Sequence, residues 1–261
     1  MVESKLKRRS PLKQQPLRNP GESLEEQLQE TFTFDVLFWV TAGLFVVAAA
    51  VMEWVRWYRH TPPTPWAYTL VAVTVVAIGG FTVPRGWKRI RNLRLGLLGE
   101  MVVGQILETL RAHGYTVLHD IPERAYNIDH VLIGPAGVFV IETKTRSKPI
   151  GHDAKVEYDG QRLLVDGLAP DRDPIKQVKA SCDRVREIIQ AATELRPFVR
   201  PVVLYPGWYV VSTPRDQDVW VLNPLNLPSF VVHERMRLKD EEIRLLTAIF
   251  ESHLRVALTP E

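Results

Sequence analysis

Three charged residues, Asp129, Glu142 and Lys144, stand in a stretch whose other residues suit buried strands, NIDHVLIGPAGVFVIETKT at residues 127–145. Side chains of these types can form a salt-bridge cluster at the end of a sheet. They can also bind a hard divalent cation and hydrolyse a phosphodiester. The second chemistry requires the two acids and the amine to share one face.

The stretch predicts a β-hairpin with GPAG at 134–137 as its connection. Counting back from this turn places Asp129 opposite Glu142, and directly opposed residues project to the same face. Lys144 is two residues beyond Glu142 and shares that face, whereas His130 turns to the other face and is expected to be structural. A register shift of one residue would separate the two acids.

Two adjacent carboxylates repel each other, and either protonation or a bound divalent cation relieves the repulsion. An oxygen-only site suits Mg²⁺, with Mn²⁺ as the alternative ion. A neighbouring lysine can orient or deprotonate a water, or stabilise charge on a phosphate. From this geometry alone, metal-assisted hydrolysis and a salt-bridge cluster are equally open.

The pattern D…ExK on consecutive strands after a helix resembles the PD-(D/E)xK nuclease superfamily, and more narrowly the nuclease-related domain, NERD. The resemblance covers residue 99 to about 225, roughly half the chain. The ExK pattern alone is weak, but the ordered set is fairly specific. The matching segments are GE at 99–100, NIDHV at 127–131, GVFVIETKT at 137–145 and DPIKQVK at 173–179.

The resemblance implies that Asp129 and Glu142 bind Mg²⁺, with the carbonyl of Thr143 as a further ligand, and that Lys144 is the catalytic lysine. It also implies roles for two helical residues. Glu100 would join the metal site directly or through water, and Gln177 would position the water or the DNA backbone. Without the resemblance, both would be assigned to solvated helix surface.

The chain departs from the family pattern after ExK, where a tryptophan is common but RSKPIGHDAKVEYDG has none. Residues 99–261 are also mildly acidic, with 20 Lys and Arg against 23 Asp and Glu, while residues 1–98 have 13 against 7. Contact with nucleic acid would therefore depend on a local basic patch. The alternative is that the residues of this patch are only solvated surface. The candidates are Arg146, Lys148, Lys155, Lys176 and Lys179.

Two uncharged runs in the N-terminal third predict a transmembrane hairpin. The first has 17 residues between Asp35 and Glu53, and the second has 24 between His60 and Arg85. A spanning helix needs about 20 residues, with a lower limit of about 17. A helical hairpin buried in a soluble core is the alternative. Aromatic residues near the ends of the runs resemble interfacial belts: Trp54, Trp57, Tyr58, Trp66, Tyr68 and Trp87.

Basic residues flank the hairpin, with six before the first run, five after the second, and only Arg56 and Arg59 in the connection. The positive-inside rule then predicts a multi-pass protein of the cell inner membrane, with both termini and the C-terminal domain in the cytoplasm. The basic run RGWKRIRNLR at 85–94 suits anionic headgroups, or alternatively a DNA backbone.

The expected organisation has three parts. Residues 1–31 form a polar, disordered cytoplasmic tail, with a short helix at 23–30 that a Ser23–Glu26 capping box would start. Residues 32–88 form the transmembrane hairpin, and residues 89–261 form the nuclease-related domain. The one cysteine, Cys182, excludes an intramolecular disulfide and suits a small buried residue.

Within the third part, helical periodicity begins at Leu95 and ends at Gly114, with a stripe of Leu98, Val102, Ile106 and Leu110. Strands are expected at 115–121, 127–133, 138–144, in a hairpin at 155–167, at 201–212 and at 219–223, with further helices at 173–195 and 239–254. This order predicts an α/β fold with a mixed sheet flanked by helices, restriction-endonuclease-like, after the transmembrane hairpin.

The leading hypothesis is a membrane-anchored, Mg²⁺-dependent endonuclease or exonuclease that hydrolyses phosphodiester bonds of DNA, or of RNA. The alternative is a non-catalytic, membrane-tethered module of nuclease ancestry that binds nucleic acid or acts as a scaffold. The expected partners are nucleic acid and the lipid bilayer. Double-strand cleavage often uses two sites, so a homodimer is a further expected partner, although no residue identifies its interface.

Overall fold

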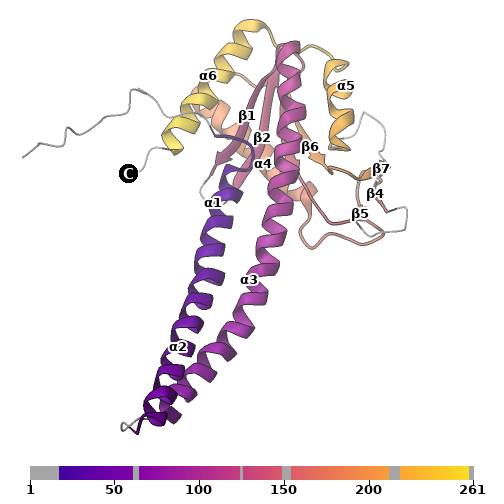
Figure 1. Ribbon diagram of the computed structural model, residues 1–261. Helices are drawn as coiled ribbons and strands as arrows, with labels where there is room; N and C mark the ends of the chain where they lie inside the picture. Colours follow the sequence, from indigo (N-terminus) through magenta and orange to yellow (C-terminus); the bar gives the residue numbers. More distant parts are fainter. Residues whose placement is uncertain (1–17, 61–64, 124–125, 149–153, 212–217, 259–261) are drawn as a thin grey trace, which may run out of the picture.

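The computed structural model describes residues 18–60, 65–123, 126–148, 154–211 and 218–258. It has an α/β fold in which mixed sheets are flanked by helices, and two long helical segments extend from one end (Figure 1). The predicted fold class is confirmed at this level. The disorder expected for residues 1–17 concerns residues outside the described part of the chain.

The larger sheet has five strands in the order β1 (Thr116–Pro122), β2 (Asn127–Gly134), β3 (Gly137–Thr143), β6 (Val199–Leu204) and β8 (Trp220–Leu222). Strands β1 to β3 pair antiparallel, and β3, β6 and β8 pair parallel. Helix α4 (Pro174–Ala192) lies in the connection from β3 to β6, as a parallel pair requires. The sheet is therefore mixed.

Both faces of this sheet are covered, which explains why every residue of β3 is buried. One face carries Phe139 and Ile141 against α3 (Pro65–Glu108) and α5 (Leu227–Val232). The other face carries Val138 and Val140 against α4 and α6 (Asp240–Ala257). The apolar run GVFVI thus follows from the central position of the strand.

A second, smaller sheet has the order β5-β4-β7, formed by β4 (Lys155–Tyr158), β5 (Leu163–Val165) and β7 (Tyr209–Val211). The predicted hairpin of β4 and β5 is confirmed. The segment expected as strand at 201–212 instead supplies β6 to one sheet and β7 to the other. A turn containing Gly207, whose φ is +75°, redirects the chain between them. The short η3 (Pro224–Asn226) and α5 were not expected.

The two long segments are α1 (Glu22–Thr31), η1 (Phe32–Leu37) and α2 (Phe38–Tyr58) on one side, and α3 on the other (Figure 1). Helix α3 joins the second apolar run and the first helix of the α/β domain in one helix that contains Pro84. The expected domain boundary between residues 88 and 89 falls inside it. The turn η2 (Thr109–His113) continues α3 to Gly114, whose φ of +80° ends it as predicted.

The predicted apolar stripe of α3 is partly wrong. Leu98 and Val102 are exposed, and the buried residues are Val103, Leu107 and Leu110. In an α-helix, each step of four residues advances about 40° beyond a full turn, so a strict i, i+4 series rotates off the buried face. The observed stripe mixes steps of four and three residues and stays on it.

Both N-terminal helical segments are long and apolar enough to cross a membrane. Buried core helices pass the same length test, but only 6% of the apolar window of the first segment and 11% of the second is buried. Large apolar side chains such as Phe45 and Trp66 are exposed on them. Exposed apolar surface of this extent indicates a membrane or partner contact, because soluble monomers rarely carry it.

The expected short helix at 23–30 is present as α1, but its predicted capping box is wrong. Gly21, with φ of +74°, precedes the helix, and no side chain caps it. The hydroxyl of Ser23 instead donates to Oδ1 of Asp120 at 2.8 Å. The N-terminal segment is thereby held against β1 of the α/β domain.

Candidate active site

The β2–β3 hairpin has the register that its turn predicts, because Val131 pairs with Val140 and His130 with Ile141. One position further, Asp129 and Glu142 come opposite each other at the open end. The backbone N–H of Thr143 donates to Oδ2 of Asp129 at 2.7 Å, which fixes this carboxylate against β3. Asp129 and Glu142 therefore share the face covered by α4.

Lys144 follows directly on β3 and its backbone N–H donates to the carbonyl of Leu204 in β6 at 2.8 Å. Its side-chain Nζ donates to Oε1 of Glu142 at 2.5 Å. The Glu142 side chain is 11% exposed and that of Lys144 is 30% exposed, so the pair faces solvent mainly through the amine. The two carboxylates and the amine thus meet as predicted.

Glu100 reaches this group from α3. An added Cβ on the preceding Gly99 would overlap Oγ1 of Thr145, so the helix approaches the end of β3 as closely as a glycine permits. The pKa of Glu100 is raised to about 7, first by burial and then by the nearby Asp120 and Glu142, while Lys144 opposes the rise. Glu100 is therefore an acid that is partly protonated at neutral pH.

The pKa of Asp129 is raised well above its ordinary value, first by burial and then by the charges of Glu142 and Glu100. The hydrogen bond from Thr143 and the charge of Lys144 oppose the rise. Acids held this close together favour either a shared proton or a bound cation.

The donor set fits a magnesium ion that keeps part of its water shell. Within the described residues, no three acidic, imidazole or thiol groups stand close enough to enclose a metal ion. Mg²⁺, however, is commonly held by one or two carboxylates together with waters and substrate phosphates. Asp129 and Glu142 supply two carboxylates, and in the stretch of chain that follows Glu142 the Oγ1 atoms of Thr143 and Thr145 are buried without a partner among the described residues.

Gln177 is placed less directly. It lies one turn into α4, on the helix that covers β3 and β6, and its Oε1 is buried without a hydrogen-bond partner among the described residues. In the part of the chain that the structure describes, no hydrogen bond joins it to Asp129, Glu142 or Lys144. The role of Gln177 remains a prediction.

Asp120 is the residue that sequence reasoning missed. On β1 it stands between His119, which pairs with His130, and Ile121, which pairs with Ile128, so it lies beside Asp129 in the sheet. Its φ is +47°, and it is 1% exposed. The available signal was an acid inside the apolar strand YTVLHDI, the same kind of signal that identified Asp129.

The carboxylate of Asp120 is fully occupied by hydrogen bonds. Oδ2 accepts from Nη1 of Arg18 and from the backbone N–H of Ser23, both at 2.8 Å. Oδ1 accepts from the Ser23 hydroxyl and from Nδ2 of Asn127, also at 2.8 Å. Asp120 therefore acts on the site through its charge on Glu100, and it has no free lone pair directed at a metal.

His130 is buried on the opposite face, where its Nδ1 lies 2.9 Å from Nδ1 of His119. Burial lowers the pKa of both imidazoles, and the paired ring lowers that of His130 further. Nε2 of His119 also contacts Oε1 of Glu108 at 3.0 Å, so a chain of contacts runs from Glu108 through both rings behind the strand. The position agrees with the structural role expected for His130.

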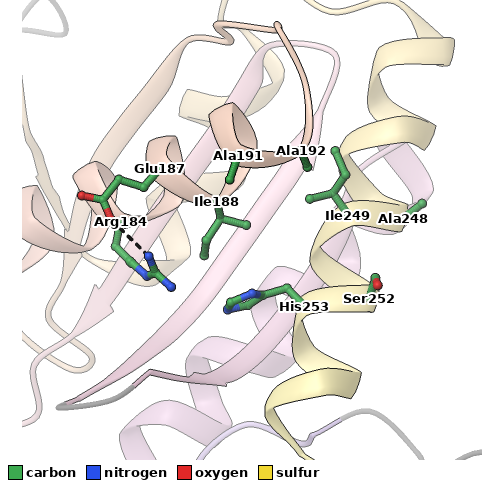
Figure 2. Close-up of a pocket in the computed structure, with 9 residues that line it drawn as sticks. All are labelled: Arg184, Glu187, Ile188, Ala191, Ala192, Ala248, Ile249, Ser252 and His253. Carbon is green, nitrogen blue, oxygen red and sulfur yellow. Dashed lines mark hydrogen bonds and ion pairs between the residues drawn. The ribbon is translucent and has the colours of Figure 1, made fainter.

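One cavity lies away from this group. It occupies about 490 Å³ between α4 and α6, where Ile188 and Ile249 face each other with Arg184 and His253 at one end (Figure 2). Arg184 and His253 both donate to Glu123, at 2.7 and 2.8 Å. Glu123 therefore holds both side chains, and none of the predicted site residues lines this cavity.

A smaller cavity of about 330 Å³ adjoins the candidate site directly, and Lys144 forms part of its wall. Arg146, Arg172 and Tyr205 also line it. The predicted basic patch is otherwise dispersed, since Lys155 pairs with Glu157 at 2.6 Å and Lys176 with Asp173 at 3.8 Å. Of that patch, Arg146 is the residue next to the carboxylates.

Comparison with known proteins gives one match. The nuclease-related domain family, NERD, matches residues 95–206. This range contains Glu100, Asp129, Glu142, Lys144 and Gln177, and it extends from α3 to the end of β6. Comparisons with curated proteins and with solved structures gave no match.

Proposed function

Residues 95–206 are a nuclease-related domain, and from this premise we propose that the chain is a membrane-anchored, Mg²⁺-dependent nuclease that hydrolyses phosphodiester bonds of DNA, with RNA as the other candidate substrate. The observation that carries the proposal is the meeting of Asp129, Glu142 and Lys144 at the open end of the β2–β3 hairpin. A family match alone indicates only common ancestry. The arrangement of these three residues in addition retains the chemical groups that hydrolysis needs.

Asp129 and Glu142 would hold the magnesium ion, with Glu100 and the Thr143 carbonyl as further candidates. When bound, Mg²⁺ polarises a phosphate and lowers the pKa of a water. Burial and the nearby charge of Glu142 raise the pKa of both Asp129 and Glu100, and a bound cation would offset both effects, which supports this assignment.

Lys144 is the cation of the set, and its side chain is more exposed than that of its partner Glu142. Its amine lies against Glu142 and can turn toward a phosphate oxygen or the attacking water. Gln177, whose Oε1 has no partner among the described residues, would position that water or the backbone of the substrate. These roles remain proposals.

The anchoring part of the proposal rests on α2 and α3. Both carry exposed apolar surface over lengths that suit a bilayer, and cations follow the second run at Arg85, Lys88 and Arg89. We place both termini and the α/β domain on the cytoplasmic side of the cell inner membrane. The site would then act on nucleic acid near the envelope.

The test uses the full chain, purified in an uncharged detergent, with covalently closed circular and linear DNA as substrates. Cleavage should require Mg²⁺ or Mn²⁺ and stop with EDTA. Asp129→Asn keeps an acceptor for the Thr143 N–H but weakens the metal site, and Lys144→Arg keeps the charge but cannot release a proton. Each should reduce the rate by about 100-fold or more.

The matched control is Lys155→Ala, which removes an exposed lysine paired with Glu157 and should cleave like wild type. Equal cleavage by wild type, Asp129→Asn and Lys144→Arg would mean that a contaminating nuclease is responsible. Cutting of the closed circle identifies an endonuclease, while cutting of the linear substrate alone identifies an exonuclease.

One observation favours the alternative of a non-catalytic binding or scaffold module. Lys144 is already in an ion pair with Glu142, which is the arrangement a structural salt bridge would have. Metal titration separates the two functions. A nuclease should show an increase in thermal stability with Mg²⁺ that Asp129→Asn loses, whereas a scaffold should show no shift with either ion.

A further inference from the structure

The groove beside Lys144 carries an excess of positive charge. Of the charged residues that line it, Lys144, Arg146 and Arg172 are cations and Asp171 is the one acid. Within the described part of the chain, neither Arg146 nor Arg172 has a carboxylate partner. Elsewhere in the domain Arg111, Arg184 and Arg186 are each paired with an acid at 3.1 Å or less.

The floor of the groove contains a polar group that nothing in the described chain satisfies. Tyr205 is 2% exposed, and its ring packs into the core under the second sheet. Its hydroxyl has no hydrogen-bond partner among the described residues and is not one of their buried, unpartnered polar atoms, so it is accessible at the groove that Tyr205 lines. The ring is thus fixed by packing, while the O–H remains available at the groove.

The same hydroxyl lies within the electrostatic field of both the groove and the candidate active site. Burial raises the pKa of Tyr205, Arg146 lowers it, and Glu142 raises it. Glu142 and Arg146 flank Lys144 on the same stretch of chain. Lys144 lines the groove and pairs with Glu142, so the groove adjoins the candidate active site.

We propose that Arg146, Arg172 and the Tyr205 hydroxyl form a binding subsite for a phosphate of a nucleic-acid strand, next to the phosphate at Lys144. The inference rests on the proposed function, since it adds a substrate contact to that site. An anionic phosphodiester complements two unpaired guanidinium groups, and the tyrosine O–H donates to one of its oxygens. The subsite orients the strand without taking part in the bond cleavage.

The experiment separates charge from hydrogen bonding. Full-length chain in uncharged detergent is titrated with fluorescent duplex and single-stranded DNA in EDTA at several salt concentrations, and anisotropy gives the affinity. Arg146→Ala and Arg172→Ala should each reduce the slope of log affinity against log salt by about 0.9 for duplex or about 0.7 for a single strand. Tyr205→Phe should leave the slope unchanged and weaken binding by about tenfold.

Two variants provide matched controls. Tyr209→Phe removes an exposed hydroxyl on β7, and Arg244→Ala removes an exposed guanidinium on α6. Both should bind like wild type. With Mg²⁺ present, the three subsite variants should raise KM with a smaller effect on kcat, because they remove positioning contacts.

The proposal is overturned if Arg146→Ala and Arg172→Ala keep the wild-type slope, or if Tyr205→Phe binds as tightly as wild type. It is also overturned if wild type binds neither DNA probe. Binding that the three variants weaken, in a protein that never cleaves, supports the subsite and rejects the nuclease. The two proposals can therefore fail separately.

Discussion

Nη1 of Arg18 donates to Oδ2 of Asp120 at 2.8 Å, across 102 positions of the sequence. The side chains are 11% and 2% exposed, so this is a buried ion pair between the segment before the first long helix and the first strand of the sheet. It fixes α1 against the domain and neutralises an acid that lies next to Glu100.

Removal of the Asp120 carboxylate should destabilise the protein strongly. Asp120→Ala leaves Arg18, Ser23 and Asn127 with donors that have lost their acceptor, and breaking a buried pair costs about 3–5 kcal/mol. Thermal unfolding of the detergent-solubilised chain, followed by tryptophan fluorescence, measures the effect. Glu26→Ala is the control, because its exposed bond to Arg18 should contribute less than about 1 kcal/mol. Equal loss in both variants would contradict this account.

Glu100 should make the stability of the metal-free protein depend on pH. Its pKa rises from 4.5 to about 7 on folding, mainly through burial. A folded state that holds a proton more tightly than the unfolded state is favoured at low pH, and that advantage is lost as the pH rises from about 4.5 to 7. The free energy of unfolding of wild type should therefore fall relative to Glu100→Gln across this range in EDTA.

Denaturant unfolding at several pH values measures the difference in the free energy of unfolding between wild type and Glu100→Gln. Because Asp129 titrates in both proteins, the difference reports on Glu100. Parallel curves for wild type and Glu100→Gln would show that Glu100 keeps an ordinary pKa. Added Mg²⁺ should reduce the difference, because a cation stabilises the ionised carboxylates.

Gly99 should tolerate no side chain. An added Cβ would overlap Oγ1 of Thr145 and lie 2.9 Å from its Cβ, so Gly99→Ala should cost about 1–3 kcal/mol and displace Glu100 from the site. Melting temperature and the rate of DNA cleavage should both fall. Thr145→Ala in the same chain should restore part of both.

Gly80→Ala is the matched control on the same helix, since nothing lies within 4 Å of the added Cβ. A helical glycine in open space usually gains stability when replaced by alanine. If Gly99→Ala and Gly80→Ala behave alike, the close approach of α3 to Thr145 is not present in solution.

Thiol labelling should reveal the membrane topology. Burial raises the pKa of the native Cys182 thiol to about 12, so wild type should react poorly with a membrane-impermeant maleimide. In spheroplasts with an intact inner membrane, the His60→Cys variant should be labelled. The Arg244→Cys variant should be labelled only after lysis. The reverse pattern, or equal labelling of both, would contradict the proposed orientation.

The part of the site that the sequence predicts is the part fixed by local chain geometry. A four-residue connection and two buried faces allow one register for the β2–β3 hairpin, so Asp129, Glu142 and Lys144 could be placed together from alternation alone. The end of α3 at Gly114 is predictable for the same reason, since its signal lies within one turn.

The remaining features depend on contacts between distant segments. Nothing local to Arg18 or Ser23 indicates that both bind Asp120, and the positive φ of Asp120 has no signal in the strand. The split of residues 201–212 between two sheets depends on which neighbours β6 and β7 find, because both have the same apolar character. The predicted apolar stripe of α3 is partly wrong because equally apolar residues lie on both sides of the residues that are buried.

In the proposed membrane-anchored arrangement, the unbroken helix α3 sets both the distance of Glu100 from the lipid surface and the direction in which Glu100 points around the helix axis. From Arg85 to Glu100 is 15 residues, 100 minus 85, or about 22 Å of helix at 1.5 Å per residue. One residue inserted between them would turn the acid by about 100° around the rod while raising it by only about 1.5 Å. The spacer length is thus constrained far more tightly by rotation than by reach, and inserting seven residues, close to two full turns, should disturb the centre less than inserting two.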